Sequence, residues 1–346
     1  MPTYTHGGDI WAYSRPMLDF SANLHPLGMP PAVAEAARSA VADAVHYPDP
    51  LCRALRGAIA RRDGVPPEQV LCGGGAADLI VRLCLALRPR SALVTAPTFS
   101  EYEEGLRLTG CGVRRHLLLP EGQFDLTDAI LPEIREGLDV LFLCNPNNPT
   151  GRLIDPDLLS EICRRCGQTG TRLVVDECFL ELTEGDGAAG LLRENPHLFL
   201  LRAFTKTYAI PGLRLGYGLC TDLDLLDRMS RAGQPWGVST VAQAAGVAAC
   251  ALPDWPEQGR ALLREQRPFL LRGLEELGCA VWAGAANYLL FRVPGVFDLK
   301  ERLEGQGILI RSCANYPGLG PDYYRTAVRT GGENSALLRA LKEVLQ

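Results

Sequence analysis

A lysine between two threonines is the side chain in this sequence that is best suited to covalent chemistry. Thr205-Lys206-Thr207 follows the apolar run 197–202, which is typical of a buried strand. A lysine reached from such a strand is poorly placed as a solvated surface charge. Partial burial lowers the pKa of an amine, so that it can react with an aldehyde. Arg214 lies further on, at the start of another apolar run, where it could bind a phosphate beside the same lysine.

Two polar features follow other predicted strands. Asp176 ends the run 172–175, and its carboxylate is either a helix N-cap or a functional anion. The turn 145–151, Asn-Pro-Asn-Asn-Pro-Thr-Gly, comes directly after the run 139–144. Its prolines and glycine make it rigid. Three asparagines at the carboxyl edge of a parallel sheet indicate hydrogen bonds to a ligand, although they could also order only their own loop.

A glycine-rich segment, Gly73-Gly74-Gly75, stands directly before the helix predicted over 77–87. Small residues at this point let the backbone N–H groups of a helix N-terminus approach a phosphate. The segment matches neither G-x-G-x-x-G nor a P-loop, which argues against a dinucleotide or ATP. Taken alone, it could be a plain turn.

Together, a phosphate loop, an asparagine turn, a strand-end aspartate, a lysine and an arginine are what pyridoxal 5′-phosphate needs. The order N-P-x-N-P-T-G (145–151), then Asp176-Glu177, then Thr205-Lys206 followed by G-L-R-x-G-Y (212–217), resembles the signature of the fold-type I aminotransferase-like enzymes. The resemblance covers most of the chain. It implies pyridoxal 5′-phosphate as cofactor, and an α/β large domain, with a mostly parallel mixed sheet between helices, beside a small α+β domain.

The resemblance also implies a role for each cofactor residue. Lys206 resembles the lysine that binds the cofactor covalently, and Asp176 the aspartate that keeps the pyridine nitrogen protonated. Asn148 resembles the asparagine that bonds the 3′-oxygen, and Tyr102 the aromatic residue that stacks on the ring. The phosphate cup would consist of Gly75, Ala76, Ala77, Thr205 and Arg214, and Tyr47 resembles the tyrosine that family members lend to the neighbouring subunit's phosphate. The match at Tyr47 implies a homodimer with shared active sites.

Two positions depart from the usual pattern of this family. Phe179 stands where a tyrosine commonly assists Asn148 at the 3′-oxygen, so that hydrogen bond is expected to be absent. Ala203 stands where a hydroxyl residue is common, and the phosphate is therefore expected to lose one contact. Such a contact is worth about 1–3 kcal/mol if nothing replaces it.

Further segments resemble one subgroup of the family, the threonine-phosphate decarboxylases of cobalamin biosynthesis. They are His6-Gly7-Gly8, 19–28, 209–211, 308–319 and 323–329. This resemblance implies that L-threonine O-3-phosphate is converted to (R)-1-amino-2-propanol O-2-phosphate and CO2. A histidinol-phosphate or related class I/II aminotransferase is the alternative, because it shares every cofactor residue. The two reactions differ in how the substrate's carboxylate is placed against the cofactor ring.

The predicted substrate carries a carboxylate and a phosphate, and three arginines near the end of the chain could bind them. Alignment with the aminotransferase arginine assigns Arg325 to the carboxylate, and Arg311 and Arg329 are assigned to the phosphate. Arg325 and Arg329 are expected on one strand at i and i+4, and hence on one face. They could instead form surface salt bridges. His6 and Asn23 are expected to complete the substrate-binding site.

The elements that must position these residues alternate along the chain. Apolar runs at 91–95, 113–119, 139–144, 172–175, 197–202 and 216–220 predict strands, and amphipathic segments between them predict helices. We expect a large cofactor domain over 45–252. Both chain ends, 1–44 and 253–346, are expected to form the discontinuous small domain.

Composition narrows the possible partners of this 346-residue chain. Apolar residues make up 47% of it, enough for a large core, and the formal net charge is −5, which argues against nucleic acid as a partner. The twelve cysteines include no complete zinc signature and are read as small hydrophobic residues, with no metal. Neither a signal peptide nor an apolar stretch long enough for a membrane span is apparent. These features predict a cytoplasmic enzyme that acts on a small molecule.

Overall fold

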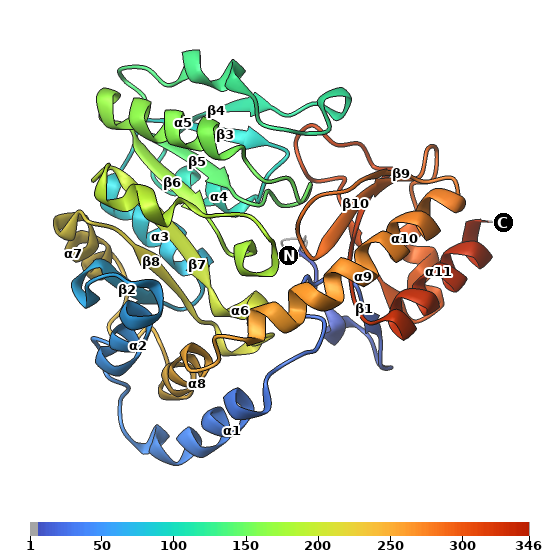
Figure 1. Ribbon diagram of the computed structural model, residues 1–346, viewed down its shortest axis with the longest axis horizontal. Helices are drawn as coiled ribbons and strands as arrows, with labels where there is room; N and C mark the ends of the chain where they lie inside the picture. The colour runs from blue at the N-terminus through green and yellow to red at the C-terminus, as the bar shows by residue number, and fades with distance from the viewer. Residues whose placement is uncertain (1–5, 346) are drawn as a thin grey trace.

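Seven strands form the larger sheet of the computed structural model, which describes residues 6–345 (Figure 1). Their order across the sheet is β2-β8-β7-β6-β5-β3-β4. β8 runs antiparallel to both of its neighbours, and the other neighbouring pairs are parallel. The strands are β2 (Val70–Gly73), β3 (Ser91–Ala96), β4 (Gly112–Leu117), β5 (Val140–Cys144), β6 (Arg172–Asp176), β7 (Leu198–Ala203) and β8 (Gly216–Leu219).

The six strands predicted from apolar runs correspond to β3 through β8, and the mostly parallel mixed sheet confirms the predicted α/β class. β2 is an additional strand at one edge of the sheet. Its four residues end in Gly73, at the start of the glycine-rich segment, so they leave too short a pattern to predict from sequence.

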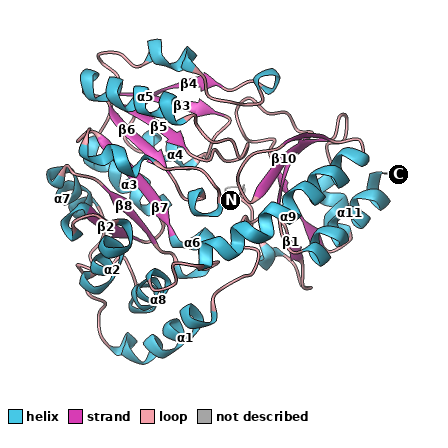
Figure 2. Ribbon diagram, in the orientation of Figure 1, coloured by secondary structure: helices cyan, strands magenta, loops and turns pink. Residues whose placement is uncertain are grey.

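Helices cover both faces of this sheet (Figure 2). Successive side chains of a strand point to opposite faces, so Leu141 and Leu143 of β5 pack into one core cluster, and Val140 and Phe142 into another. Both faces are therefore buried, which explains why the strands read as continuous apolar runs. The first cluster includes residues of α2 (Arg53–Asp63), α5 (Pro156–Thr169) and α8 (Thr240–Cys250), and the second includes residues of α3 (Ala76–Leu87), α4 (Glu101–Arg107) and α7 (Leu223–Ala232).

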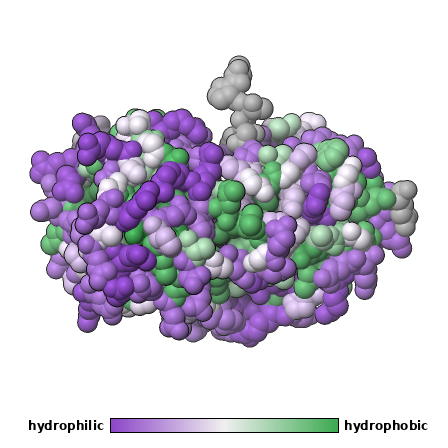
Figure 3. Space-filling view, turned by 90° about the horizontal axis from the view of Figure 1, so that it is seen from above, coloured by the Kyte–Doolittle hydropathy of each residue, from purple (hydrophilic) through white to green (hydrophobic). Residues whose placement is uncertain are grey.

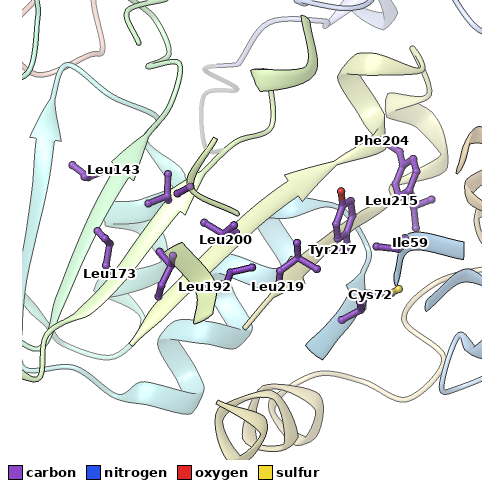
Figure 4. Packing of buried hydrophobic residues seen from close by; sticks show 14 of the residues in the cluster. Ile59, Cys72, Leu143, Leu173, Leu192, Leu200, Phe204, Leu215, Tyr217 and Leu219 are labelled. Carbon is purple, nitrogen blue, oxygen red and sulfur yellow. The ribbon is translucent and has the colours of Figure 1, made fainter. Parts of the chain in front are cut away.

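Figure 4 shows part of the first cluster at close range. Leu200 of β7 and Leu219 of β8 are fully buried, and they pack in the same cluster as Ile59 of α2. Each such side chain contributes roughly 1.5–3 kcal/mol on leaving water. This packing fixes the strands whose carboxyl ends carry the predicted functional residues.

A second, smaller unit contains a four-stranded antiparallel sheet in the order β12-β13-β10-β9. Its core cluster includes Phe20, Leu289, Phe291 and Leu337. A two-stranded parallel sheet of β1 and β11 lies in the same unit. The elements are β1 (Leu18–Asp19), β9 (Ala280–Trp282), β10 (Tyr288–Arg292), β11 (Ile308–Leu309), β12 (Arg311–Ser312) and β13 (Tyr323–Ala327), with α9 (Trp255–Glu276), α10 (Leu299–Gly305) and α11 (Gly331–Leu345).

The first helix, α1 (Pro31–Ser39), lies against α8 of the larger unit (Figure 1). Its Val33 is fully buried in the first core cluster of the seven-stranded sheet. The division into 45–252 and the two chain ends stays a prediction, but this packing favours placing residues 31–44 with the larger unit. Residues 18–20 join the smaller unit, where β1 pairs with β11 and Phe20 is part of the core.

Hydrophilic side chains cover most of the face of the molecule that Figure 3 shows, and hydrophobic side chains gather near its middle. Within the part of the chain that the structure describes, no helix has both the length and the apolar composition that a membrane span requires.

Short helical turns connect the longer elements. They are α6 (Phe204–Thr207) and the 3-10 helices η1 (Ile10–Ala12), η2 (Ala40–Val45), η3 (Pro67–Gln69), η4 (Pro120–Gly122), η5 (Asp128–Glu133), η6 (Leu180–Leu182), η7 (Ala188–Arg193) and η8 (Pro211–Leu213).

Candidate active site

A cavity of about 530 Å³ lies where the carboxyl ends of the central strands meet the smaller unit and the N-terminal segment. The register of the sheet pairs Cys144 with Asp176 and Asp176 with Leu201, so the segments that follow β5, β6 and β7 emerge side by side. Eleven of the predicted site residues line this cavity: His6, Asn23, Ala76, Ala77, Asn148, Asp176, Thr205, Lys206, Arg214, Arg311 and Arg325.

Lys206 lies on the short helix α6, directly after β7. Burial, and then the positive charges of Arg325 and Arg214, lower the pKa of its amine to about 8. The amine lies 5.6 Å from the centroid of the Phe179 ring. Two hydrogen bonds hold the backbone of this turn: His25 N donates to the Lys206 carbonyl (2.9 Å) and Trp255 Nε1 donates to the Thr207 carbonyl (3.1 Å).

Asp176 is the last residue of β6, and its side chain is buried. Cys178 N donates to one carboxylate oxygen, Oδ1, at 2.9 Å, and the Tyr102 hydroxyl donates to the other, Oδ2, at 2.7 Å. Burial raises the pKa of this carboxyl group, while hydrogen bonds from Cys178 and Tyr102 and the charge of Lys206 act in the opposite direction. A cation in the cavity would stabilise the ionised form further.

The glycine-rich segment and Arg214 form a cradle at the start of α3. Gly75 is the N-cap of this helix, with φ +96°. A Cβ atom at Gly75 would lie 2.6 Å from Arg214 Nη2, so only glycine lets the guanidinium approach the helix N-terminus this closely. The backbone at Ala76 and Ala77, with the nearby Thr205, lines the same part of the cavity. Backbone N–H groups and a guanidinium in this arrangement suit a phosphate.

Arg325 connects the smaller unit to the cofactor-binding edge of the large sheet. It lies on β13 and is buried. Its Nη1 donates to Asn148 Oδ1, and its Nη2 donates to the Ser21 carbonyl at 2.7 Å. Its Nε, and both side-chain amide atoms of Asn23, are buried without a hydrogen bond in the described part of the chain. Such atoms at the wall of a cavity are available to a polar ligand.

Arg311 faces Arg325 across the two strands β12 and β13, which are paired at these residues. Its Nη1 donates to the Ser312 carbonyl (2.6 Å), and its Nη2 donates to Asn315 Oδ1 (2.7 Å). Burial lowers the pKa of its guanidinium, and Arg325 adds to that effect. Like charges directly opposite each other are unfavourable, so this pair suits a ligand with more than one negative charge.

His6 lies at the wall contributed by the N-terminal segment. Its Nε2 is 3.0 Å from Glu101 Oε1, and the hydrogen bond from His6 lowers the pKa of that carboxyl group. Its ring centroid lies 6.1 Å from that of Phe99. His6 therefore connects the beginning of the described chain with α4.

Arg329 requires a correction, because it does not line the cavity. Strand β13 ends at Ala327, so the predicted i and i+4 relation to Arg325 fails. The Arg329 guanidinium pairs with Glu333 at 2.6 Å and donates to the Asp19 carbonyl at 3.2 Å. The structure thus shows Arg329 in a salt bridge, which is the alternative that the sequence left open.

Tyr102 also lies elsewhere than the stacking role requires. Its side chain is fully buried outside the cavity, stacked on Phe142 with centroids 5.1 Å apart. Phe99, in the same sequence segment, lines the cavity instead, and its ring meets the edge of Tyr102. The sequence offered two aromatic residues three positions apart, and the spacing alone did not show which of them faces the ligand.

Tyr47 lies outside the cavity of its own chain. Its side chain is exposed and stacks on Trp236, with ring centroids 4.6 Å apart. This placement leaves open the role in a neighbouring subunit that the sequence predicts. A residue that the sequence did not single out, Tyr316, lines the cavity from the loop before β13, in the segment 308–319 that carries the subgroup resemblance.

The chain matches the family model "Aminotransferase class I and II" over residues 15–344. It belongs to this family. It is 42% identical to threonine-phosphate decarboxylase of Salmonella typhimurium, over 95% of this chain and 91% of the relative. It is 34% identical to histidinol-phosphate aminotransferase of Anaeromyxobacter sp., over 94% and 90%. The crystal structure of the histidinol-phosphate aminotransferase from Clostridium acetobutylicum superimposes with a TM-score of 0.88 at 26% identity, covering 95% of this chain and 99% of that one.

Membership of the class I and II aminotransferase family confirms the predicted cofactor, pyridoxal 5′-phosphate. The residues present fit it: the cradle at Gly75 and Arg214 suits its phosphate, the buried carboxylate of Asp176 suits a cationic ring nitrogen, and the amine of Lys206 suits its aldehyde. Within residues 6–345 there is no group of three or more His, Cys, Asp and Glu side chains that could hold a metal ion.

The lowered pKa of Lys206 can be measured directly, because the sequence contains only three lysines, at positions 206, 300 and 342. In cofactor-free protein labelled with 13C at the lysine ε-carbon, we expect one resonance to titrate with a midpoint near pH 8. The variant Lys206→Arg should lack that resonance. If the resonance lost in the variant instead titrates at the ordinary lysine value of about 10.4, burial does not depress this amine.

Proposed function

We propose that this protein is an L-threonine O-3-phosphate decarboxylase. It would break the bond between Cα and the carboxylate carbon of its substrate, release CO2, and add a proton at Cα to give (R)-1-amino-2-propanol O-2-phosphate. The observation that carries this proposal is the pair Arg311 and Arg325, which face each other at the cavity wall and match the two anionic groups of the substrate. The 42% identity to the Salmonella typhimurium threonine-phosphate decarboxylase supports it.

Pyridoxal 5′-phosphate, when bound, supplies an electron-withdrawing ring that stabilises negative charge at Cα of an amino acid. The residues that would hold it are Lys206 at its aldehyde, Asp176 at its ring nitrogen and Asn148 at its 3′-oxygen. Phe99 would pack on the ring in place of Tyr102. Phe179 offers no hydroxyl beside Asn148. Ala203 offers no hydroxyl to the phosphate, which the cradle at Gly75 and Arg214 would bind instead.

Two arginines would bind and orient the substrate. Arg325 would bind the carboxylate, with its unpaired Nε available to the ligand, and Arg311 would bind the substrate phosphate. Asn23, whose amide is unpaired within the described chain, would add a polar contact, and His6 would close the same side of the cavity. Holding the substrate at two anionic groups fixes which Cα bond lies perpendicular to the ring, and hence which bond breaks.

Lys206 would return the proton to Cα after CO2 has left. With a pKa of about 8, its amine exchanges protons readily near neutral pH, which suits a general acid and base. Asp176 would keep its negative charge opposite the ring nitrogen, with one of its oxygens, Oδ1, fixed by Cys178 N. The product would enter cobalamin biosynthesis.

Incubation with L-threonine O-3-phosphate tests the activity. We expect CO2 to be released with no oxo acid present, and Lys206→Ala to abolish turnover because no other lysine lines the cavity among the described residues. The alternative, a histidinol-phosphate aminotransferase, has support from relatives such as the one from Anaeromyxobacter sp.. Transfer of an amine from glutamate to an oxo acid, with no CO2 from threonine phosphate, would decide for that alternative.

Substitution of the arginines separates substrate binding from structure. Arg311→Gln should raise KM for threonine phosphate about tenfold or more, since a charge-assisted pair to the phosphate is lost. Arg292→Gln is the matched control, because Arg292 lies on the same sheet, pairs with Asp322 and does not line the cavity.

Arg329 provides the contrast to Arg311. Arg329→Gln breaks the ion pair with Glu333, so the midpoint of thermal unfolding should fall while KM stays near that of the unsubstituted protein. An increase in KM equal to that of Arg311→Gln would restore Arg329 to the phosphate site.

We also propose a homodimer in which Tyr47 completes the phosphate site of the neighbouring subunit. Tyr47 and the nearby Val45 are strongly exposed in the single chain, which supports burial of this region by a second copy. Mixing subunits of Tyr47→Ala with subunits of Lys206→Ala should restore about a quarter of the intact sites, because half of the dimers are mixed and each has one complete site. No gain over the separate variants, or a monomer in solution, would refute shared sites.

A cytoplasmic location is part of the same proposal. All twelve cysteines are free thiols, and most of them are buried, which suits a reducing compartment. Cell fractionation followed by the decarboxylase assay would check this location.

A further inference from the structure

The Tyr102 hydroxyl and the Asp176 carboxylate form a hydrogen bond that the cofactor roles assigned so far do not use. The oxygen atoms are 2.7 Å apart, and both side chains are buried. Asp176 lines the cavity and Tyr102 does not, so the hydroxyl reaches the carboxylate from outside the cavity wall. The bond joins α4 to the end of β6.

The position of that hydroxyl is fixed by the packing of its ring. Tyr102 is stacked on Phe142 with an interplanar angle of 17°, and Phe99 meets it nearly perpendicularly at a centroid distance of 5.6 Å. The side chain is 0% exposed. A ring held on two sides in this way cannot turn its hydroxyl elsewhere without disturbing the core.

The charge of Asp176 depends on its donors. Burial raises the pKa of this carboxyl group, and donors to its oxygens favour the ionised form. The pKa of Tyr102 is itself raised by burial and by Asp176, so its hydroxyl stays protonated and donates at any working pH. The other titratable groups around Asp176 are Cys144 on β5, Cys178 after β6, Lys206 on α6 and Tyr288 on β10, whose pKa burial also raises, so that it is neutral. Burial raises the pKa of both thiols, so they are neutral.

We propose that Tyr102 is a positioning residue, which acts through Asp176 and keeps that carboxylate ionised and oriented toward the ring nitrogen of the cofactor. This inference rests on the cofactor assigned in the proposed function and replaces the stacking role predicted from sequence. Its two parts are separable: Phe99 contacts the ring, and Tyr102 controls the charge opposite the ring nitrogen.

The test compares two ligands that differ only at that nitrogen. Pyridoxal 5′-phosphate and its analogue with C–H in place of the ring nitrogen are bound to the unsubstituted protein and to Tyr102→Phe, and the dissociation constants are measured. The variant should bind pyridoxal 5′-phosphate about tenfold more weakly, the loss of one hydrogen bond to a charged group, and should bind the analogue unchanged. Arg214→Gln is the matched control, since it removes a contact to the phosphate that both ligands share and should weaken both equally.

A spectroscopic measurement gives a second readout. With 15N at the ring nitrogen of bound pyridoxal 5′-phosphate, Tyr102→Phe should lower the pH at which that nitrogen loses its proton by about one unit. Placing 3-fluorotyrosine at position 102 keeps the ring and strengthens the donor, so it should move the same pH in the opposite direction. This variant also serves if Tyr102→Phe does not fold.

Two outcomes would overturn the inference. Equal weakening of both ligands in Tyr102→Phe would show that the residue only supports packing, and an unchanged 15N titration in the fluorotyrosine protein would show that its donor strength does not reach the ring nitrogen. Neither measurement uses the substrate. A chain that binds the cofactor but does not decarboxylate threonine phosphate would refute the proposed function and leave this inference intact.

Discussion

Everything at this site depends on ionisable groups held out of water at the carboxyl edge of one parallel sheet. Asp176 is buried and Lys206 is partly buried, and this burial moves the pKa of the amine down and that of the carboxyl group up. The sheet can hold them because its strands are apolar on both faces and register the ends of β5, β6 and β7 together. Donors already in place around Asp176 then reduce the cost of keeping its charge there.

Arg325 connects this buried site to the rest of the molecule. One of its nitrogen atoms binds Asn148 of the large sheet, and another binds the carbonyl of Ser21 in the N-terminal segment. The small sheet, the large sheet and the start of the chain therefore meet at a single guanidinium. A ligand anion at Arg325 would contact the group that holds these three parts together.

The sequence predicted the parts of the site that follow from local order along the chain. Asp176 ends a strand, and Asn148 and Lys206 follow within four residues of strands, and all three strands have apolar runs long enough to recognise. Arg329 failed because strand β13 ends at Ala327, and no residue type marks that end. Tyr102 and Phe99 could not be distinguished because both are aromatic residues three positions apart. The direction of the Tyr102 ring depends on Phe142 of β5, which is distant in the sequence, and Phe99 packs on Tyr102 in turn.

The register of β12 and β13 gives the strongest physical reason for a substrate with two anionic groups. It places Arg311 opposite Arg325, where the charges repel each other, and burial lowers the pKa of the Arg311 guanidinium. A carboxylate and a phosphate together would neutralise the charges of the two guanidinium groups. Threonine phosphate brings both anionic groups in one molecule. Histidinol phosphate carries a phosphate but no carboxylate, so in an aminotransferase only the amino donor, glutamate, would bring two anionic groups to this pair.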